Sequence, residues 1–150
     1  MDFAEEVAGW LYNEFIKDIR LGISYEQKLA SIKMCGKNEL PIRLIALIDD
    51  KCVGTVSLVQ NDLRGCDYTP WLASLYVDVP YRKQKIGEQL VERVKDITRE
   101  LGYTELYLRT EHAGNYYRRL GWQYIGSQKD EFGLVPEIFK TRTGDGSMSC

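Results

Sequence analysis

Apolar residues at the start of the chain recur at helical spacing. Val7, Leu11 and Phe15, with Trp10 beside them, fall on one face of a helix, because residues three or four positions apart share a helix face. We expect Gly22 to end this element.

A second helix is predicted directly after the first. Ser24 followed by Gln27 forms a capping-box pattern, in which the two side chains satisfy free backbone N–H groups at a helix start. This helix carries Leu29 and Ile32 and stops near Gly36. The first part of the chain is therefore expected to be helical.

From residue 43 onward the pattern becomes that of strands. Segment 43–49 (RLIALID) is short, apolar and β-branched, and segment 52–60 (CVGTVSLVQ) follows it after a turn, which predicts a hairpin. A loop over 61–70 leads to 71–79 (WLASLYVDV), which is apolar on both faces. Such a pattern is typical of a central strand that is covered on both sides.

A long amphipathic helix is predicted after Pro80, which stops the central strand. Its apolar positions step by four or three residues and form one continuous stripe. The stripe consists of Ile86, Leu90, Val94, Ile97 and Leu101. Gly102 is the expected C-terminal stop of this helix.

The rest of the chain alternates between strands and one short helix. The expected elements are a strand over 104–110, a helix over 113–120 and strands over 122–128 and 134–142. Strand–helix–strand over 71–110 requires a parallel pair with a right-handed crossover. We predict an α/β (α+β) fold with a mixed, mostly antiparallel sheet, a central parallel strand pair and helices on both faces. One domain is expected over 1–142, and 143–150 is expected to be a flexible C-terminal tail.

The composition is that of an ordinary soluble domain. Of the 150 residues, 44% are hydrophobic and 28% are charged, and the net charge is −2. This charge argues against a nucleic-acid partner and fits a cationic substrate better than an anionic one. No apolar run is long enough to cross a bilayer, and the acidic N-terminus does not resemble a signal peptide. We expect a cytoplasmic protein with no membrane partner.

Histidine and cysteine usage excludes several kinds of site. His112 is the single histidine, so a metal site with several His ligands is excluded. The four cysteines form no CxxC pair and are expected to be free thiols. The patterns GxSxG, GxxxxGK[ST] and GxGxxG do not occur. We therefore expect no metal, no covalent serine chemistry and no standard nucleotide loop.

The segment 81–87 (YRKQKIG) lies between the central strand and the amphipathic helix. The first N–H groups of a helix have no acceptor inside it, and they carry the positive end of its dipole. Arg82, Lys83 and Lys85 add three cations, and Gly87 has no Cβ to keep a ligand away from the backbone. These features predict a pyrophosphate-binding corner, although a basic loop before a helix can also be plain solvated surface.

The segment 75–94 (LYVDVPYRKQKIGEQLVERV) resembles motif A of the GNAT superfamily of acyl-CoA N-acyltransferases, a [QR]xxGx[GA] loop after a strand. Arg82 matches its first position and Gly87 its last, whereas Lys85 replaces its middle glycine. The resemblance implies that residues 82–88 bind the phosphates of acetyl-CoA. The residues implied are Arg82, Lys83, Gln84, Lys85, Ile86, Gly87 and Glu88. Lys85 can present the same backbone N–H as glycine only if its side chain turns outward.

A second motif follows at 115–122 (NYYRRLGW), which resembles the aromatic-Tyr-x-x-Leu-Gly-aromatic signature of the same superfamily. It implies that Tyr117 is the general acid and that Asn115 meets the pantetheine arm. On residue type alone, Tyr117 is equally an amphipathic aromatic that anchors a short helix. The two motifs occur in the family's order, and the resemblance covers roughly residues 41–142, which implies a single acetyltransferase domain.

The implied reaction is the transfer of an acetyl group from acetyl-CoA to a primary amine, by direct attack in a ternary complex. The amine must be neutral, the oxyanion needs a donor and the departing thiolate needs a proton. The resemblance implies a bulge in the central strand, with the backbone N–H groups of Leu75, Tyr76 and Val77 meeting the thioester and pantetheine. A Tyr117 phenol with a pKa of about 10 can protonate a thiolate whose thiol has a pKa of about 8.5.

The sequence offers several candidates for the general base and for the acceptor site. Glu111 and His112, at the end of a strand, are the base candidates, with Asp62 and Asp67 as further carboxylates. Asp62, Tyr68 and Trp71 are candidates for the acceptor pocket, and Trp71 is equally a core residue. Each of these residues can also be a plain loop or surface residue.

The acceptor is expected to be a small amine, a peptide N-terminus or a lysine, and a homodimer is possible within the family. The alternative hypothesis is a non-catalytic acyl-CoA-binding or regulatory module of the same fold, in which Tyr117 is structural.

Overall fold

The structure, a computed structural model, describes residues 3–16, 25 and 40–143. The expected helix end at Gly22 and all of the expected tail 143–150 except Thr143 lie outside these residues, and of the expected second helix only Tyr25 is described. The chain divides into two compact units, 1–57 with 74–92 and 58–73 with 93–150. Each unit is described by itself.

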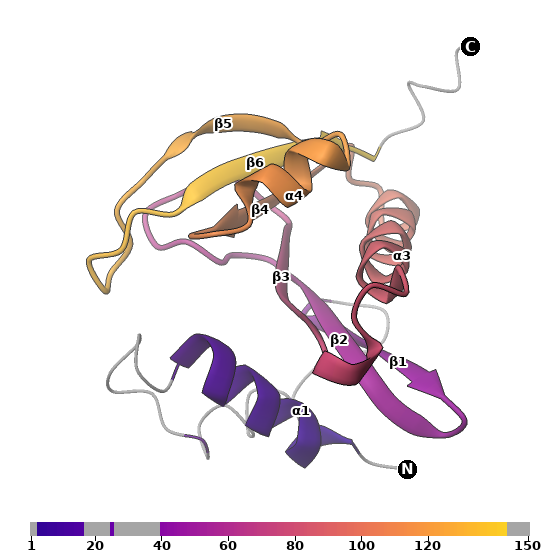
Figure 1. The fold of residues 1–150 in the computed structure, drawn as a ribbon. Coiled ribbons are helices and arrows are strands. Elements are labelled where there is room, and N and C mark those ends of the chain that lie inside the picture. Colours follow the sequence, from indigo (N-terminus) through magenta and orange to yellow (C-terminus); the bar gives the residue numbers. More distant parts are fainter. Residues whose placement is uncertain (1–2, 17–24, 26–39, 144–150) are drawn as a thin grey trace. The chain divides into compact units, whose positions relative to one another are not determined.

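The observed elements follow the predicted order (Figure 1). They are α1 (Ala4–Leu11), η1 (Tyr12–Ile16), β1 (Ile42–Ile48), β2 (Lys51–Val59), β3 (Trp71–Val77), η2 (Val79–Tyr81), α3 (Ile86–Glu100), β4 (Glu105–Thr110), α4 (Gly114–Arg119), β5 (Gln123–Ser127) and β6 (Glu137–Arg142). The strands hydrogen-bond in the order β1-β2-β3-β4-β6-β5, so β3 is central as predicted. β3 pairs parallel to β4, and β6 pairs antiparallel to both β4 and β5. The predicted mixed sheet with one parallel pair is confirmed.

In the first unit, α1 buries the face that the sequence pattern predicts. Val7 and Leu11 are fully buried and cluster with the buried thiol of Cys52 on β2, and Trp10 and Tyr76 pack against this cluster. After Leu11 the chain continues as η1, a single π-helical turn, which the helical spacing does not predict. The buried face anchors α1 to the strands through apolar contacts.

The predicted apolar stripe of α3 is largely confirmed. Ile86, Leu90 and Val94 are buried, but Leu101 lies beyond the end of the helix at Glu100 and is 37% exposed. Gly54 on β2 allows α3 to approach closely, because a Cβ at this position would lie 3.3 Å from Leu90 Cδ1. Because Ile86 is the first residue of α3 and is buried, this apolar face also holds the helix start, where the loop after β3 ends.

The second unit contains β4, β6, β5 and α4 (Figure 1). β4 and β6 pair along their whole length, from Glu105 opposite Arg142 to Thr110 opposite Glu137. The core of this unit includes the buried side chains of Leu106 and Leu108 on β4 and of Ile138 and Phe139 on β6. Three consecutive residues of β4 are buried, and its last two residues, Arg109 and Thr110, are half-buried.

Candidate functional site

The end of β3 departs from regular strand geometry. Ser74 lies inside the strand with a φ of 57°, a left-handed conformation that is uncommon for residues other than glycine. The irregularity falls where the family resemblance implies a bulge, directly before Leu75, Tyr76 and Val77. These three half-buried residues are the predicted backbone donors.

A short 3₁₀ turn joins β3 to the basic loop. Asp78 caps this turn, because its carboxylate accepts a hydrogen bond of 3.0 Å from the Val79 N–H. The backbone N–H of Asp78 donates to Val53 O on β2 at 2.8 Å, and the N–H of Arg82 donates to Val79 O at 3.2 Å. These bonds fix the direction in which the chain leaves the strand.

The loop that follows contains two lysines in the left-handed region. Lys83 has a φ of 70° and Lys85 a φ of 64°, and both side chains are exposed. Lys85 therefore adopts the conformation that glycine favours, at the position where the motif has glycine. Backbone N–H groups in such turns make concave anion sites, and α3 begins with the next residue, Ile86.

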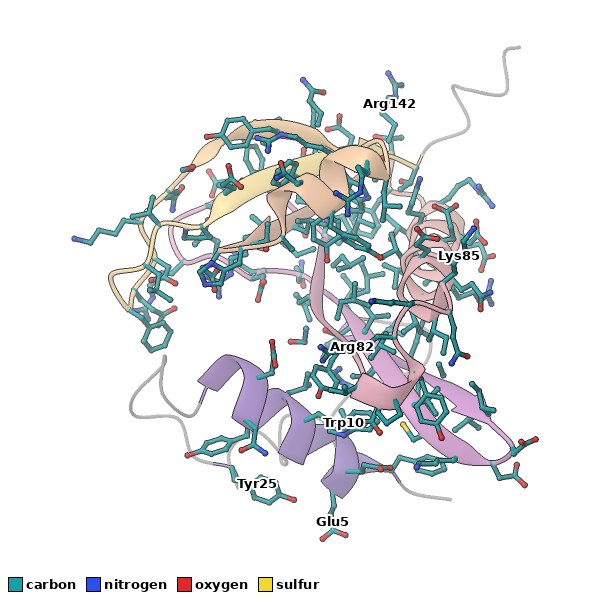
Figure 2. The ribbon with its side chains drawn as sticks, viewed as in Figure 1. Glu5, Trp10, Tyr25, Arg82, Lys85 and Arg142 are labelled. Carbon is teal, nitrogen blue, oxygen red and sulfur yellow. The ribbon has the colours of Figure 1, made fainter. Side chains whose placement is uncertain are left out.

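The third cation of the loop is held by the protein itself. Arg82 Nε donates a hydrogen bond of 2.8 Å to Val77 O, and its guanidinium lies 5.1 Å from the centroid of the Tyr76 ring. Figure 2 labels Arg82 beside Trp10 of α1, and the Trp10 and Tyr76 ring centroids are 5.4 Å apart. Arg82, Tyr76 and Trp10 thus form one stack. Tyr76 belongs to the end of β3, and Arg82 also bonds to the last residue of that strand, Val77.

The second group of predicted residues lies in the second unit, at the start of α4. Thr110 Oγ1 accepts hydrogen bonds from the backbone N–H groups of His112 (3.3 Å) and Ala113 (2.9 Å). The threonine side chain therefore shapes the turn between β4 and α4. Glu111 is half-buried in this turn, and His112 is exposed.

Tyr117 is a buried residue of α4. It is 7% exposed, and its ring lies 5.1 Å from that of Tyr116, 5.8 Å from Trp122 and 6.4 Å from Phe139. Burial, and to a smaller extent Tyr116, raise the pKa of Tyr117 well above that of a free tyrosine. The phenol therefore keeps its proton at physiological pH and releases it less readily than free tyrosine.

Asn115 and Gly114 define the first turn of α4. Asn115 Oδ1 accepts a hydrogen bond of 3.3 Å from Arg118 Nη1, and Arg118 also forms an ion pair of 3.7 Å with Glu137 on β6. Gly114 is buried, and a Cβ at this position would collide with Glu137 Oε1. Gly114 therefore allows α4 to lie close to β6.

A buried ion-pair network, which the sequence analysis did not identify, connects two loops to β4. Arg109 Nη1 lies 3.0 Å from Asp130 Oδ2, and Arg109 Nε lies 3.3 Å from Asp62 Oδ2. The exposed side-chain fractions are 13% for Arg109, 3% for Asp130 and 29% for Asp62. Asp130 also accepts backbone N–H bonds of 2.9 Å from Phe132 and Leu134. An arginine in the apolar strand 104–110 is the sequence signal that could have indicated this network.

Charge and hydrogen bonding determine the protonation of this network. Burial alone would raise the pKa of Asp130, but the N–H groups of Leu134 and Phe132, together with Arg109, hold it below its usual value. Burial would lower the pKa of Arg109, but Asp62 and Asp130 outweigh it and raise that pKa. Asp62, a predicted acceptor residue, is therefore paired with Arg109.

The aromatic candidates form a cluster in the second unit. Trp71 is fully buried, and its Nε1–H donates a hydrogen bond of 2.7 Å to Tyr68 O; of its two predicted roles, the structure shows that of a core residue. Tyr68 is 42% exposed and stacks on Tyr107 with a centroid distance of 4.5 Å. Burial and a hydrogen bond to Glu105 raise the pKa of Tyr107 to about 12.

Among residues 3–16, 25 and 40–143, no helix is both long and apolar enough to span a bilayer. No group of three His, Cys, Asp or Glu side chains there is arranged to hold a metal ion.

Comparison with known proteins gives relatives in both sequence and structure. N-alpha-acetyltransferase 30 of Schizosaccharomyces pombe is 32% identical over 82 residues, which are 52% of this chain and 55% of that protein. The chain thus spans about half the length of this relative. An aminoglycoside 6'-N-acetyltransferase complexed with coenzyme A has the same fold, with a TM-score of 0.73, 16% identity and coverage of 93% of this chain and 90% of that one.

A second solved structure agrees with the first. N-acetylglutamate synthase from Neisseria gonorrhoeae, complexed with coenzyme A and N-acetyl-glutamate, has a TM-score of 0.70 and 18% identity over 95% of this chain and 33% of that one. The sequence model of the acetyltransferase (GNAT) family matches residues 7–122, which is more than half of the chain. The protein therefore belongs to the acetyltransferase (GNAT) family.

Proposed function

We propose that the protein transfers an acetyl group from acetyl-CoA to a primary amine, by direct attack in a ternary complex. The observation that carries this proposal is the conformation of Lys85, whose φ of 64° reproduces glycine geometry in the loop before α3. The family's anion-binding turn is thus compatible with this sequence, although the motif glycine is absent.

The residues of the loop fit the phosphates of acetyl-CoA. The exposed side chains of Lys83 and Lys85 supply positive charge, and the N–H groups at the start of α3 supply donors. In the proposal, the backbone over 82–88 binds the pyrophosphate and Asn115 binds the pantetheine arm. Acetyl-CoA itself supplies the activated acetyl thioester.

The chain's own residues then serve the chemical step. The N–H groups of Leu75, Tyr76 and Val77 stabilise negative charge on the thioester oxygen. Tyr117 gives a proton to the departing thiolate, and Glu111 or His112 removes a proton from the amine. Asp62 is a weaker choice for the base, because its carboxylate is already paired with Arg109.

The names of two relatives and the net charge of −2 support an amine as the acceptor. One relative is named an N-alpha-acetyltransferase and another an aminoglycoside acetyltransferase. The acceptors to test are therefore a peptide with a free N-terminus, a lysine side chain, an aminoglycoside and a polyamine. In the proposal, the exposed face of Tyr68 contacts this acceptor.

One observation favours the alternative of a non-catalytic acyl-CoA-binding module. Tyr117 is buried among aromatic rings and its pKa is raised, as expected for a residue that only anchors α4. In that case acetyl-CoA would bind, but no amine would be acetylated.

The experiment combines binding and turnover. Acetyl-CoA is expected to raise the melting temperature, and thiol release is expected with at least one amine of the panel. Tyr117→Phe is expected to lower kcat by about a hundredfold with little change in acetyl-CoA affinity. Tyr124→Phe is the matched control, because Tyr124 is 43% exposed. Binding without turnover on every amine would refute catalysis, and an unchanged kcat in Tyr117→Phe would refute the role of Tyr117.

A further inference from the structure

The guanidinium of Arg82 contacts other residues of the protein, and these contacts are not explained by a role in binding phosphate. Its Nε donates to Val77 O at 2.8 Å, and the cation lies over the Tyr76 ring at 5.1 Å from the centroid. Both partners belong to the end of β3. Arg82 therefore reaches back to the strand, away from the loop in which it lies.

The peptide group between Val77 and Asp78 forms hydrogen bonds through both its oxygen and its N–H. The C=O of Val77 and the N–H of Asp78 belong to the same planar peptide. Arg82 holds the oxygen of this peptide, and Val53 O on β2 accepts its N–H at 2.8 Å. The orientation of the last peptide of β3 is thus fixed by two bonds.

The Tyr76 ring is confined by two neighbours. Arg82 lies at 5.1 Å, and Trp10 of α1 lies at 5.4 Å with an interplanar angle of 33°. Trp10 is itself anchored, because it packs against the buried cluster of α1 and Cys52. Side chains from α1, β3 and the loop thus form one stack.

This support coincides with a weak point of the strand. Ser74, two residues before Tyr76, has a φ of 57°, so regular strand geometry is interrupted there. The residues beyond it need other contacts to hold their backbone N–H groups in one orientation. The Trp10–Tyr76–Arg82 stack and the bond to Val77 provide such contacts.

We propose that Arg82 is a positioning residue that holds the end of β3, with Tyr76 and Trp10 behind it, so that the β3 N–H groups face the thioester. This inference rests on the proposed acetyl transfer. Positive charge for the phosphates then comes from Lys83 and Lys85, whose side chains are exposed.

The first test needs no ligand. Arg82→Lys keeps the charge but removes the Nε–H donor and the planar group. Hydrogen exchange of the backbone amides at 76–78 is expected to accelerate about tenfold in this variant, because its protecting contacts are lost. Arg93→Gln is the control, since the Arg93 side chain is 59% exposed and its ion pair with Glu100 is 4.0 Å long. Equal exchange rates in wild type and Arg82→Lys would overturn the proposal.

The second test separates positioning from phosphate binding. Arg82→Lys and Arg82→Met are both expected to lower kcat about tenfold, while the Kd for acetyl-CoA and its dependence on salt stay within about twofold of wild type. Lys83→Met and Lys85→Met are expected to weaken binding at low salt and to reduce the salt dependence. If Arg82→Lys behaves like wild type while Arg82→Met loses affinity and salt dependence, Arg82 is a phosphate ligand and the inference is wrong.

The stack offers a variant remote from the loop. Trp10→Leu is expected to accelerate exchange at 76–78 and to lower kcat without changing the Kd for acetyl-CoA, whereas slow exchange with unchanged kcat would contradict the inference. The melting temperature and the stoichiometry of acetyl-CoA binding identify the folded, binding fraction of each variant. If the wild type neither binds nor consumes acetyl-CoA, the proposed function fails, and the exchange experiment still decides whether Arg82 holds β3.

Discussion

Replacement of Arg109 by methionine is expected to destabilise the second unit strongly. Asp130 is 3% exposed and lies 3.0 Å from Arg109, so removal of the arginine leaves a buried carboxylate without its cation. Breaking a buried pair in this way costs about 3–5 kcal/mol. Asp130 keeps two backbone N–H bonds from Phe132 and Leu134, which favours the lower end, about 3 kcal/mol.

The second partner of Arg109 adds little to this value. Asp62 is 29% exposed and its contact is longer, at 3.3 Å, so Asp62→Asn is expected to cost about 1 kcal/mol or less. For a chain of this length, about 3 kcal/mol corresponds to a fall in melting temperature of roughly 10 °C. Urea unfolding followed by circular dichroism measures both variants against wild type.

The pH dependence provides a second check on the same pair. The pKa of Asp130 is lowered in the folded state, so its contribution to stability is present above the unfolded value of about 3.9 and is lost as the pH falls through the folded pKa. The gap in unfolding free energy between wild type and Arg109→Met is therefore expected to be full at pH 7 and to shrink below about pH 4. A gap under about 1 kcal/mol at pH 7, or one that does not change with pH, would refute the reasoning.

Substitutions at Lys85, Gly114 with Glu137, and Tyr107 test local features of the structure. Lys85→Gly is expected to leave the unfolding free energy unchanged or to raise it by up to about 1 kcal/mol, because glycine removes the strain of a positive φ, whereas Lys85→Val is expected to lower it; denaturant melts of both variants decide this. Gly114→Ala is expected to lose about 1 kcal/mol, and Glu137→Ala in the same chain is expected to restore part of the loss, because Glu137 Oε1 is the atom that the new methyl group meets; additive losses in the double-mutant cycle would contradict this. Tyr107 has its pKa raised to about 12, so its contribution to stability is full below pH 10 and is lost between about pH 10 and 12, and Tyr107→Phe is expected to flatten that alkaline loss; an equally steep alkaline transition would count against the role of its hydrogen bond to Glu105.

The sequence pattern correctly predicted the helices whose apolar residues recur at helical spacing. Val7 and Leu11 on α1 and Ile86, Leu90 and Val94 on α3 occupy the buried faces that their spacing indicated. These predictions succeed because burial of an apolar stripe dominates helix placement. The end of α3 was placed one residue too far at Leu101, since helix ends depend on local hydrogen bonds that an apolar pattern does not contain.

The details of the candidate site depend on contacts between residues that are distant in sequence. Asp62 and Asp130 lie 47 and 21 residues from Arg109, and no spacing rule connects them. The left-handed φ of Ser74 and Lys85 was equally hidden, because neither residue type favours that conformation. The motifs located the basic loop and α4, whereas the partners of Arg82 became visible only in the structure.

The pairing of Arg109 with two carboxylates also limits how the surface of this fold can be altered. Asp62 belongs to the connection between β2 and β3, and Asp130 belongs to the connection between β5 and β6. If a loop from another member of the family replaces one of these connections and lacks the acidic residue, Arg109 loses one of its two carboxylate partners. A replacement loop must therefore carry a carboxylate at the equivalent position. Variation of either loop is therefore constrained by Arg109 on β4, which needs a carboxylate from each of them.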